Sequence, residues 1–199
     1  MKRFLLVIGI AVLAQTGIAA AQQQPVVRIL IAYYSETGNT EKMAQAIRDG
    51  AKSVAGVEVT LQKTADVKDE TIPAYDGVVV GTPVHWSNLS AESKRFLDRL
   101  GGALWKAKTT GDGRTAGAFC TGGSVSMGKD VARLSIISAL LTMRFIVVGG
   151  VDASGFGTLG PQATTGAADP GMSATELAEG RAFGERFART TLQMRAARK

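Results

Sequence analysis

Hydroxyl and amide side chains crowd into residues 35–40, Ser-Glu-Thr-Gly-Asn-Thr, between an apolar run and a helical pattern. The start of a helix presents unpaired backbone N–H groups and a partial positive charge, which together favour a phosphate. Ser35, Thr37 and Thr40 can donate further hydrogen bonds, and Gly38 lets the backbone approach a ligand closely. The segment has neither the lysine of a Walker loop nor the GxGxxG spacing. It predicts a phosphate-binding turn, and the alternative is an ordinary polar turn that caps a helix.

Two further segments follow expected strands and carry small, aromatic or polar residues. Residues 81–88, Gly-Thr-Pro-Val-His-Trp-Ser-Asn, come directly after the apolar run 78–80, and residues 121–124, Thr-Gly-Gly-Ser, follow the next strand. Trp86 can lie against a flat ring and His85 can hydrogen-bond it. In open α/β sheets, ligands bind at the carboxyl ends of the strands. The three segments therefore predict one site at one edge of a sheet, although His85 and Trp86 taken alone are also compatible with a plain surface loop.

Alternating strand-like and helix-like patterns must position these segments. Apolar or alternating runs predict strands at 26–34, 57–61, 77–81, 115–121 and 145–148. Helical periodicity predicts helices at 40–54 and 131–141, a helix that Ser90 caps and Gly101-Gly102 ends, and a last helix with a Ser173/Glu176 capping box that buries Leu177, Phe183 and Phe187. A long loop is expected from 149 to 171. This order indicates an α/β fold with a parallel sheet covered on both faces.

The composition limits the classes of function. The 199 residues suffice for one domain, and the formal charge of +6 comes from scattered basic residues rather than a nucleic-acid stripe. One cysteine, Cys120, and one histidine exclude an internal disulfide and make a metal site unlikely by ligand count, so no metal is expected.

The first residues have the order of a secretory signal peptide. Lys2 and Arg3 precede an uncharged apolar run, and three alanines end at Ala21. We expect a leader at 1–21, cleavage after Ala21, a mature domain at 22–199 and a periplasmic or secreted protein. An uncleaved leader that anchors the chain is the alternative, because the apolar run is short for a membrane span.

The motifs together resemble the flavodoxin-like superfamily and, within it, the WrbA-type NAD(P)H:quinone oxidoreductases. The resemblance covers nearly all of the expected mature chain. It rests on 33–35 and 37–40, 81–83, Asn88, 96–98, 101–102, Trp105, 121–123, 156–157 and 163–165.

The resemblance implies a three-layer, doubly wound fold with a five-stranded parallel sheet in the order 2-1-3-4-5. It implies FMN as the cofactor, NAD(P)H as co-substrate, a quinone-type acceptor and a homo-oligomer, either a dimer or a tetramer. The implied catalytic residues are His85, Trp86 and Trp105, with Trp105 reaching the site of a neighbouring subunit. The implied cofactor-binding residues are Ser35, Glu36, Thr37, Gly38, Asn39, Thr40, Pro83, Val84, His85, Trp86, Thr121, Gly122, Gly123 and Ser124.

Two other functions remain open from the sequence. The first is a flavodoxin-type electron carrier, which the basic charge disfavours because such carriers are usually acidic. The second is a binding module that has lost its flavin, since Leu140-Leu141 replaces a histidine pair of the resembled family.

Overall fold

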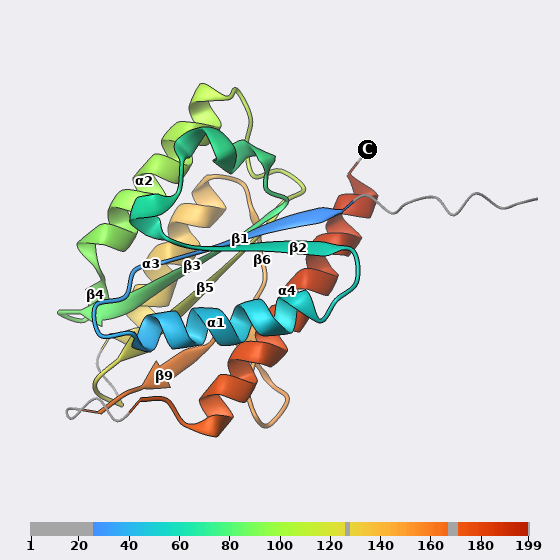
Figure 1. The fold of residues 1–199 in the computed structure, drawn as a ribbon. Helices are drawn as coiled ribbons and strands as arrows, with labels where there is room; N and C mark the ends of the chain where they lie inside the picture. Colours follow the sequence, from blue (N-terminus) through green and yellow to red (C-terminus); the bar gives the residue numbers. More distant parts are fainter. Residues whose placement is uncertain (1–25, 126–127, 167–170, 199) are drawn as a thin grey trace, which may run out of the picture.

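Five parallel strands form the centre of a three-layer α/β fold (Figure 1). The computed structural model describes residues 26–125, 128–166 and 171–198, so the expected leader at 1–21 lies outside the described residues. The strands lie in the order β2-β1-β3-β5-β6. Their bounds are β1 Val27–Tyr33, β2 Val57–Lys63, β3 Gly77–His85, β5 Thr115–Gly122 and β6 Ile146–Val147. Numbered among themselves, these strands have the order 2-1-3-4-5, which confirms the expected topology.

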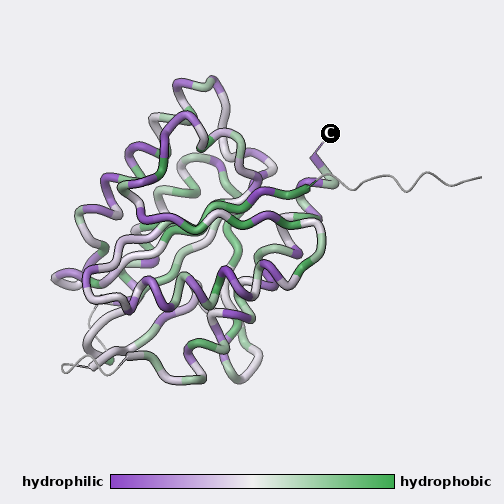
Figure 2. The backbone as a smooth tube through the Cα atoms, in the orientation of Figure 1, coloured by the Kyte–Doolittle hydropathy of each residue, from purple (hydrophilic) through white to green (hydrophobic). Residues whose placement is uncertain are grey.

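Two helices cover each face of the sheet. α1 (Asn39–Lys52) and α4 (Ala174–Ala197) pack on one face, while α2 (Ala91–Lys106) and α3 (Lys129–Thr142) pack on the other. The residues of β1 alternate between the two cores: Ile29 and Ile31 join the first, and Leu30 and Ala32 the second. Both faces of the strand are thus apolar, as buried parallel strands require. Figure 2 shows this as hydrophobic colour along the central strands, whereas α1 alternates in colour.

Helices α1 and α4 approach each other through glycines. A Cβ atom at Gly50 would lie 1.9 Å from the carbonyl oxygen of Arg181, and one at Gly184 would lie 2.0 Å from that of Ile47. No larger residue fits at either position without moving a helix. This close packing fixes α1, whose first turn carries one side of the candidate site.

The expected end of α2 at Gly101-Gly102 is wrong, because the helix continues to Lys106. Leu100 and Leu104 are both buried, so the apolar face extends past the glycines, and Gly101 lies beside Met143 of the neighbouring helix. Small residues here allow close helix contact rather than a stop. The Ser90 cap is confirmed, since its side chain accepts a hydrogen bond from the Ser93 N–H.

Other boundaries differ less. The expected capping box of the last helix is present, and Phe183 and Phe187 are buried, but Leu177 is only half-buried. Two 3-10 helices, η1 (Thr64–Asp66) and η2 (Asp69–Ala74), connect β2 to β3. None of the helices in the described ranges is long and apolar enough to cross a membrane.

The expected loop from 149 to 171 contains strands. β7 (Gly150–Val151) and β8 (Gly157–Thr158) pair with each other, and β9 (Gln162–Thr164) runs parallel to the carboxyl half of β5. The sheet therefore has an additional strand next to the candidate site, and β9 lies at the lower left of Figure 1.

A tight hairpin extends β3 beyond its expected end. β4 (Asn88–Leu89) pairs with β3 in the antiparallel direction, which leaves Trp86 and Ser87 as a two-residue turn. Both have positive φ, 49° and 64°, the backbone signature of a type I′ turn. The turn packs on Gly128, where a Cβ would lie 2.3 Å from the Cα of Ser87.

Candidate functional site

The carboxyl ends of β1, β3 and β5 surround one cavity of about 260 Å³. The loop after β9 closes its remaining side. This places the cavity at the edge of the sheet where the three motifs were expected to meet. The residues that line it are Glu36, Thr37, Asn39, Thr40, Pro83, Val84, His85, Thr121, Gly122, Gly123, Thr165 and Gly166.

The β1–α1 end of the cavity offers donors without a positively charged side chain. The Ser35 hydroxyl accepts hydrogen bonds from the backbone N–H groups of Gly38 (3.1 Å) and Glu41 (3.2 Å), which folds the loop into the first turn of α1. Gly38 has a φ of 91°, which a residue with a side chain adopts only with strain. Thr37 is exposed and lines the cavity. This end therefore suits a phosphate held by hydroxyl and backbone donors.

A hydroxyl pair ties this loop to the next strand end. Thr40 and Thr121 lie 2.8 Å apart through their Oγ1 atoms, and both side chains are buried. The pair fixes α1 against β5 at the bottom of the cavity. One proton of the pair is used between the two hydroxyls, so at most one O–H remains to donate to a ligand.

One wall of the cavity carries the histidine. His85 Nε2 lies 3.3 Å from a carboxylate oxygen of Glu36, and the imidazole meets the ring of Tyr34 edge-on at 6.1 Å. The His85 side chain is about one-third exposed and that of Glu36 two-thirds, so the contact is open to water. The pKa of Tyr34 is raised by desolvation and by the nearby carboxylates of Glu92 and Glu36. The mouth of the cavity is thus solvated, negatively charged on this side, and accessible to a second ligand.

The β5–α3 end of the cavity contains a buried lysine. Lys129 is 5% exposed, and its ammonium donates hydrogen bonds to the carbonyl oxygen of Ser124 (2.9 Å) and to the hydroxyl of Thr164. Burial also raises the pKa of the neighbouring Cys120 thiol to about 12. This end therefore buries a positive charge, while Gly123 and Ser124 of the adjoining loop are exposed. The sequence analysis did not identify Lys129, because its burial depends on β9.

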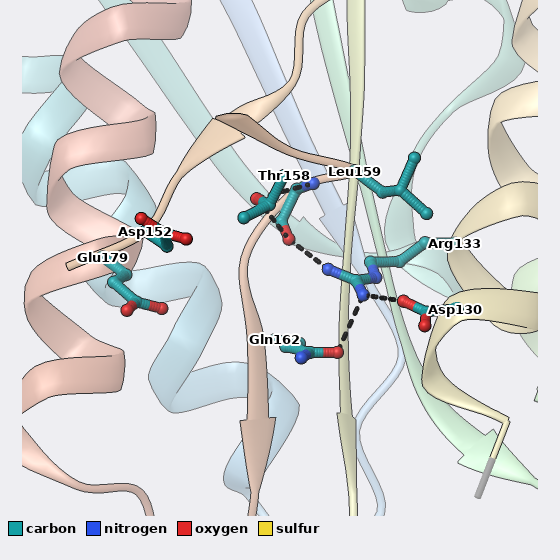
Figure 3. A pocket seen from close by; sticks show the side chains of 8 residues that line it. Asp130, Arg133, Asp152, Thr158, Leu159, Gln162 and Glu179 are labelled. Atoms are coloured by element: carbon teal, nitrogen blue, oxygen red, sulfur yellow. Dashed lines mark hydrogen bonds and ion pairs between the residues drawn. The ribbon is translucent and has the colours of Figure 1, made fainter. Parts of the chain in front are cut away.

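A larger cavity of about 530 Å³ lies away from the strand ends, between α3, the β7–β8 hairpin and α4 (Figure 3). Its central feature is Arg133, which is 3% exposed and donates to the carbonyl of Gly160, the carboxylate of Asp130 and the amide oxygen of Gln162. Each guanidinium nitrogen already has an acceptor within the protein. We conclude that Arg133 holds the segment before β9 against α3, and so supports the candidate site from outside.

The structure brings most of the expected site residues together. Among the expected cofactor-binding residues, Ser35, Gly38, Trp86 and Ser124 do not line the cavity. Ser35 and Gly38 shape the loop, and Ser124 accepts from Lys129. Trp86 is fully exposed at the hairpin tip. The sequence analysis did not assign Thr165 or Gly166 to the site, although 163–165 is among the segments that carry the family resemblance.

Trp105 is not part of the cavity of its own chain. It is 86% exposed in the last turn of α2, and because α2 starts beside the cavity its end lies at the opposite edge of the sheet. Instead, Trp105 lines a separate hollow with Lys106, Lys108, Thr109 and Thr110. Within the described residues, no cluster of histidine, cysteine or carboxylate side chains could hold a metal ion.

Sequence comparisons match a known family and named relatives. The family model described as flavodoxin matches residues 31–125. A flavodoxin of Aquifex aeolicus is 37% identical over 128 residues, which cover 64% of this chain and 68% of that protein. An NAD(P)H dehydrogenase (quinone) of Chromohalobacter salexigens is 32% identical over 143 residues, covering 61% of this chain and 70% of that protein.

Solved structures share the fold. A flavodoxin, WrbA-like protein from Agrobacterium tumefaciens superposes with a TM-score of 0.67 at 23% identity, covering 84% of this chain and 98% of that one. A flavodoxin from the domain Archaea superposes with a TM-score of 0.65 at 20% identity, covering 83% and 99%. At these identities the likeness supports the fold alone.

Proposed function

The chain belongs to the flavodoxin family, and on that premise we propose that it binds FMN in the strand-end cavity and catalyses NAD(P)H-dependent reduction of a quinone-type acceptor. The observation that carries the proposal is the continuity of the cavity. One hollow joins the hydroxyl-rich start of α1 to the Val84–His85 wall and to the glycine loop after β5. The relative named as an NAD(P)H dehydrogenase (quinone) supports the choice of reaction.

The residues present fit a flavin mononucleotide. A phosphate monoester matches the first turn of α1, where Thr37 and backbone N–H groups supply donors and the loop 35–40 contains no cation. A flat ring matches the wall that Val84 and Gly122 form together, since a Cβ at Gly122 would approach a Val84 methyl to 3.3 Å and the two residues therefore lie side by side. The absence of a side chain at Gly122 leaves room for a ring against this wall.

When bound, FMN supplies the hydride and electron chemistry. The protein residues bind and orient. The first turn of α1 would hold the phosphate, and Val84 and Gly122 would form a wall against the ring. Pro83, in the same wall, has no backbone N–H to donate. His85 stands at the open mouth, where it can hydrogen-bond an acceptor that enters from solvent.

The test uses the purified mature chain incubated with FMN. We expect a flavin absorbance spectrum and NADPH oxidation that accelerates when benzoquinone is added. His85→Ala should lower the acceptor-dependent rate more than it lowers FMN affinity. A colourless protein that fails to bind added FMN, or a flavoprotein without quinone-dependent turnover, would overturn the proposal.

A flavodoxin-type electron carrier is the second candidate. It is favoured by the 37% identical flavodoxin and by Trp86, whose full exposure beside the cavity mouth suits contact with a protein partner. A carrier would take up electrons one at a time, so a reductive titration would change the flavin absorbance in two separate stages. A reductase would show one stage.

We further propose that the chain is exported and that a homo-oligomer completes its site. The leader pattern predicts a mature N-terminus at Gln22 outside the cytoplasm, which N-terminal sequencing of the secreted or periplasmic fraction would test. Trp105 would reach the cavity of a neighbouring copy. If sedimentation shows a monomer with FMN bound, or if Trp105→Ala leaves quinone reduction unchanged, this role of Trp105 is wrong.

A further inference from the structure

Lys129 is a buried cation without a carboxylate partner. It is 5% exposed, and the acceptors of its ammonium are two neutral oxygens, on Ser124 and Thr164. Within the described residues no aspartate or glutamate forms an ion pair with it. Burying an ammonium in this way is costly unless a negative charge arrives to compensate it.

The carboxylates near Lys129 have other hydrogen-bond partners. On α3, Asp130 forms an ion pair with Arg133 rather than with Lys129. Glu176 of α4 accepts from the backbone N–H of Thr164 (2.7 Å) and from the N-terminal cap of its own helix. Glu176 keeps its negative charge but reaches the ammonium only through Thr164, which bonds to both, so within the described residues no carboxylate pairs with Lys129 directly.

The stem of Lys129 lies directly behind the cavity wall. A Cβ at Gly122 would lie 3.4 Å from the Lys129 Cγ and 3.3 Å from a Val84 methyl. Gly122 and Val84 both line the cavity, so the stem of the lysine packs directly against residues of the cavity wall. The two acceptors of the ammonium adjoin the same wall, because Ser124 follows the lining residue Gly123 and Thr164, the last residue of β9, precedes the lining residue Thr165.

We propose that Lys129 is the counter-charge for the negative charge that bound flavin acquires on reduction, and that it thereby raises the reduction potential of this chain's flavin. The inference rests on the proposed function. Hydride transfer brings two electrons and one proton from NAD(P)H, which leaves as NAD(P)⁺, so the neutral ring system gains one negative charge. A quinone then accepts the hydride together with one proton from solvent and leaves as the hydroquinone.

The charge appears at the end of the cavity where Lys129 lies. The cavity runs from the first turn of α1 to Thr121, Gly122 and Gly123, so a flavin whose phosphate lay on α1 would place its ring against these residues and the charge it gains near Lys129. Electrostatic interaction with an ammonium in a water-excluded site is much stronger than in solvent. This stabilisation of the reduced, negatively charged ring favours uptake of two electrons together, as in hydride transfer.

Affinity for FMN in both oxidation states provides the first measurement. In the unaltered protein, reduced FMN should bind at least as tightly as oxidised FMN, which places the potential of the bound cofactor at or above that of free FMN. Weaker binding of reduced FMN would overturn the proposal without the need for any variant.

Substitutions then separate charge from packing. Lys129→Met should weaken reduced FMN at least tenfold relative to oxidised FMN, which corresponds to a potential lower by about 30 mV for a two-electron couple. Lys129→Arg should keep the potential near that of the unaltered protein. Lys52→Met removes the same charge from an exposed position at the end of α1 and should leave the potential unchanged.

The apoprotein gives the readout that a structural role would not produce. Without flavin, Lys129→Met should be as stable as the unaltered chain or more stable, because it removes an uncompensated buried charge. If Lys129 serves only to join Ser124 to Thr164, the variant should be less stable and should bind both oxidation states equally weakly. That result, or a potential insensitive to Lys129 in a protein that does bind FMN, would overturn this inference alone. Failure to bind FMN at all would overturn the proposed function.

Discussion

The two ends of the cavity treat charge in opposite ways. The β1–α1 end is open to water and carries no cationic side chain, only hydroxyls and the first turn of a helix. The β5–α3 end, named the closed end below for its buried charge, holds the ammonium of Lys129 out of water beside an exposed loop. A phosphate is charged at all times and needs only dipoles that are already oriented towards it. The negative charge of a flavin ring is present only in its reduced form, so a buried cation stabilises that form relative to the oxidised one. On the proposed function, this difference means that one end of the cavity binds the cofactor and the other sets its reactivity.

The largest effect is expected when Arg133, which supports the β5–α3 end from outside, is replaced. Arg133→Met deletes a buried guanidinium that serves Gly160, Gln162 and Asp130. We expect the free energy of unfolding to fall by about 3 kcal/mol, because buried acceptors lose their donors. Urea denaturation measures this. Arg186→Met is the matched control, since Arg186 also donates to the segment before β9, at Gly149, but from an exposed position, and it should change stability little. An equal loss in both variants would show that Arg133 is not the support.

The open end is tested by Thr37→Ala. We expect FMN affinity to fall by about 1–3 kcal/mol, the effect of a lost hydrogen bond to a charged group. Both oxidation states should lose the same amount, so the reduction potential should stay constant, unlike in Lys129→Met. Calorimetry with oxidised and reduced FMN measures both values. Thr142→Ala, an exposed hydroxyl on α3, is the control. Unchanged affinity would remove this loop from the site, and a shifted potential would contradict the separation of roles.

The stability of the chain at alkaline pH reports how well Cys120, next to Lys129, is shielded from water. Burial raises the pKa of Cys120 from 9.0 to about 12, so the folded chain keeps this proton while the unfolded chain releases it. Stability is therefore fully present below about pH 9 and is lost as the pH rises towards 12, by about 1.4 kcal/mol per pH unit.

Unfolding curves between pH 8 and 11 measure that slope. Cys120→Ala should flatten it, whatever its own packing cost. Tyr33, whose pKa burial and Glu41 raise to about 12, adds to the slope above pH 10, and Tyr33→Phe isolates its share. A native chain that reacts with iodoacetamide as fast as the unfolded chain at pH 8 would show that water reaches the closed end.

The smallest effect is expected at the hairpin tip, which belongs to neither end. Trp86 has a φ of 49° and a fully exposed side chain. Trp86→Gly should relieve backbone strain and stabilise the fold by about 0.5–1 kcal/mol, without changing FMN affinity. Thermal unfolding and calorimetry measure the two. Trp105→Gly, within a helix, should instead destabilise by about 1 kcal/mol. A large loss of FMN affinity in Trp86→Gly would restore Trp86 as a wall of the cavity.

Local sequence signals predicted the open end well and the closed end poorly. Residues 35–40 form a contiguous motif between a strand and a helix, so their types and order suffice to locate the loop. Lys129 occupies the first position of a helix, where a lysine is ordinarily exposed. Its burial depends on β9, and the three residues of β9 lie in a glycine- and threonine-rich stretch without strand periodicity. The closed end is therefore made by pairing between distant segments.

Two further misses have local physical causes. The β3–β4 hairpin was not predicted, because a type I′ turn normally requires Asn-Gly or similar residues and here consists of Trp86 and Ser87. The end of α2 was placed too early, because Gly101-Gly102 has the pattern of a helix stop. Packing against Met143 and the continued burial of Leu104 outweigh that preference. In both cases tertiary contact overrides a propensity of about 1 kcal/mol.

The pairing of β5 with two separate partners sets an order of assembly during synthesis. The start of β5 pairs with β6, whereas its carboxyl half pairs with β9, about forty residues further along the chain. A ribosome adds residues from the N-terminus, so β1, α1 and β3 leave it before β9 and α4 do. The residues of the phosphate loop would then be present before α4 fixes α1, and while the ring-binding end of the cavity is still open. Cofactor captured at that stage would be held by its phosphate alone, and docking of β9 would be the step that encloses it.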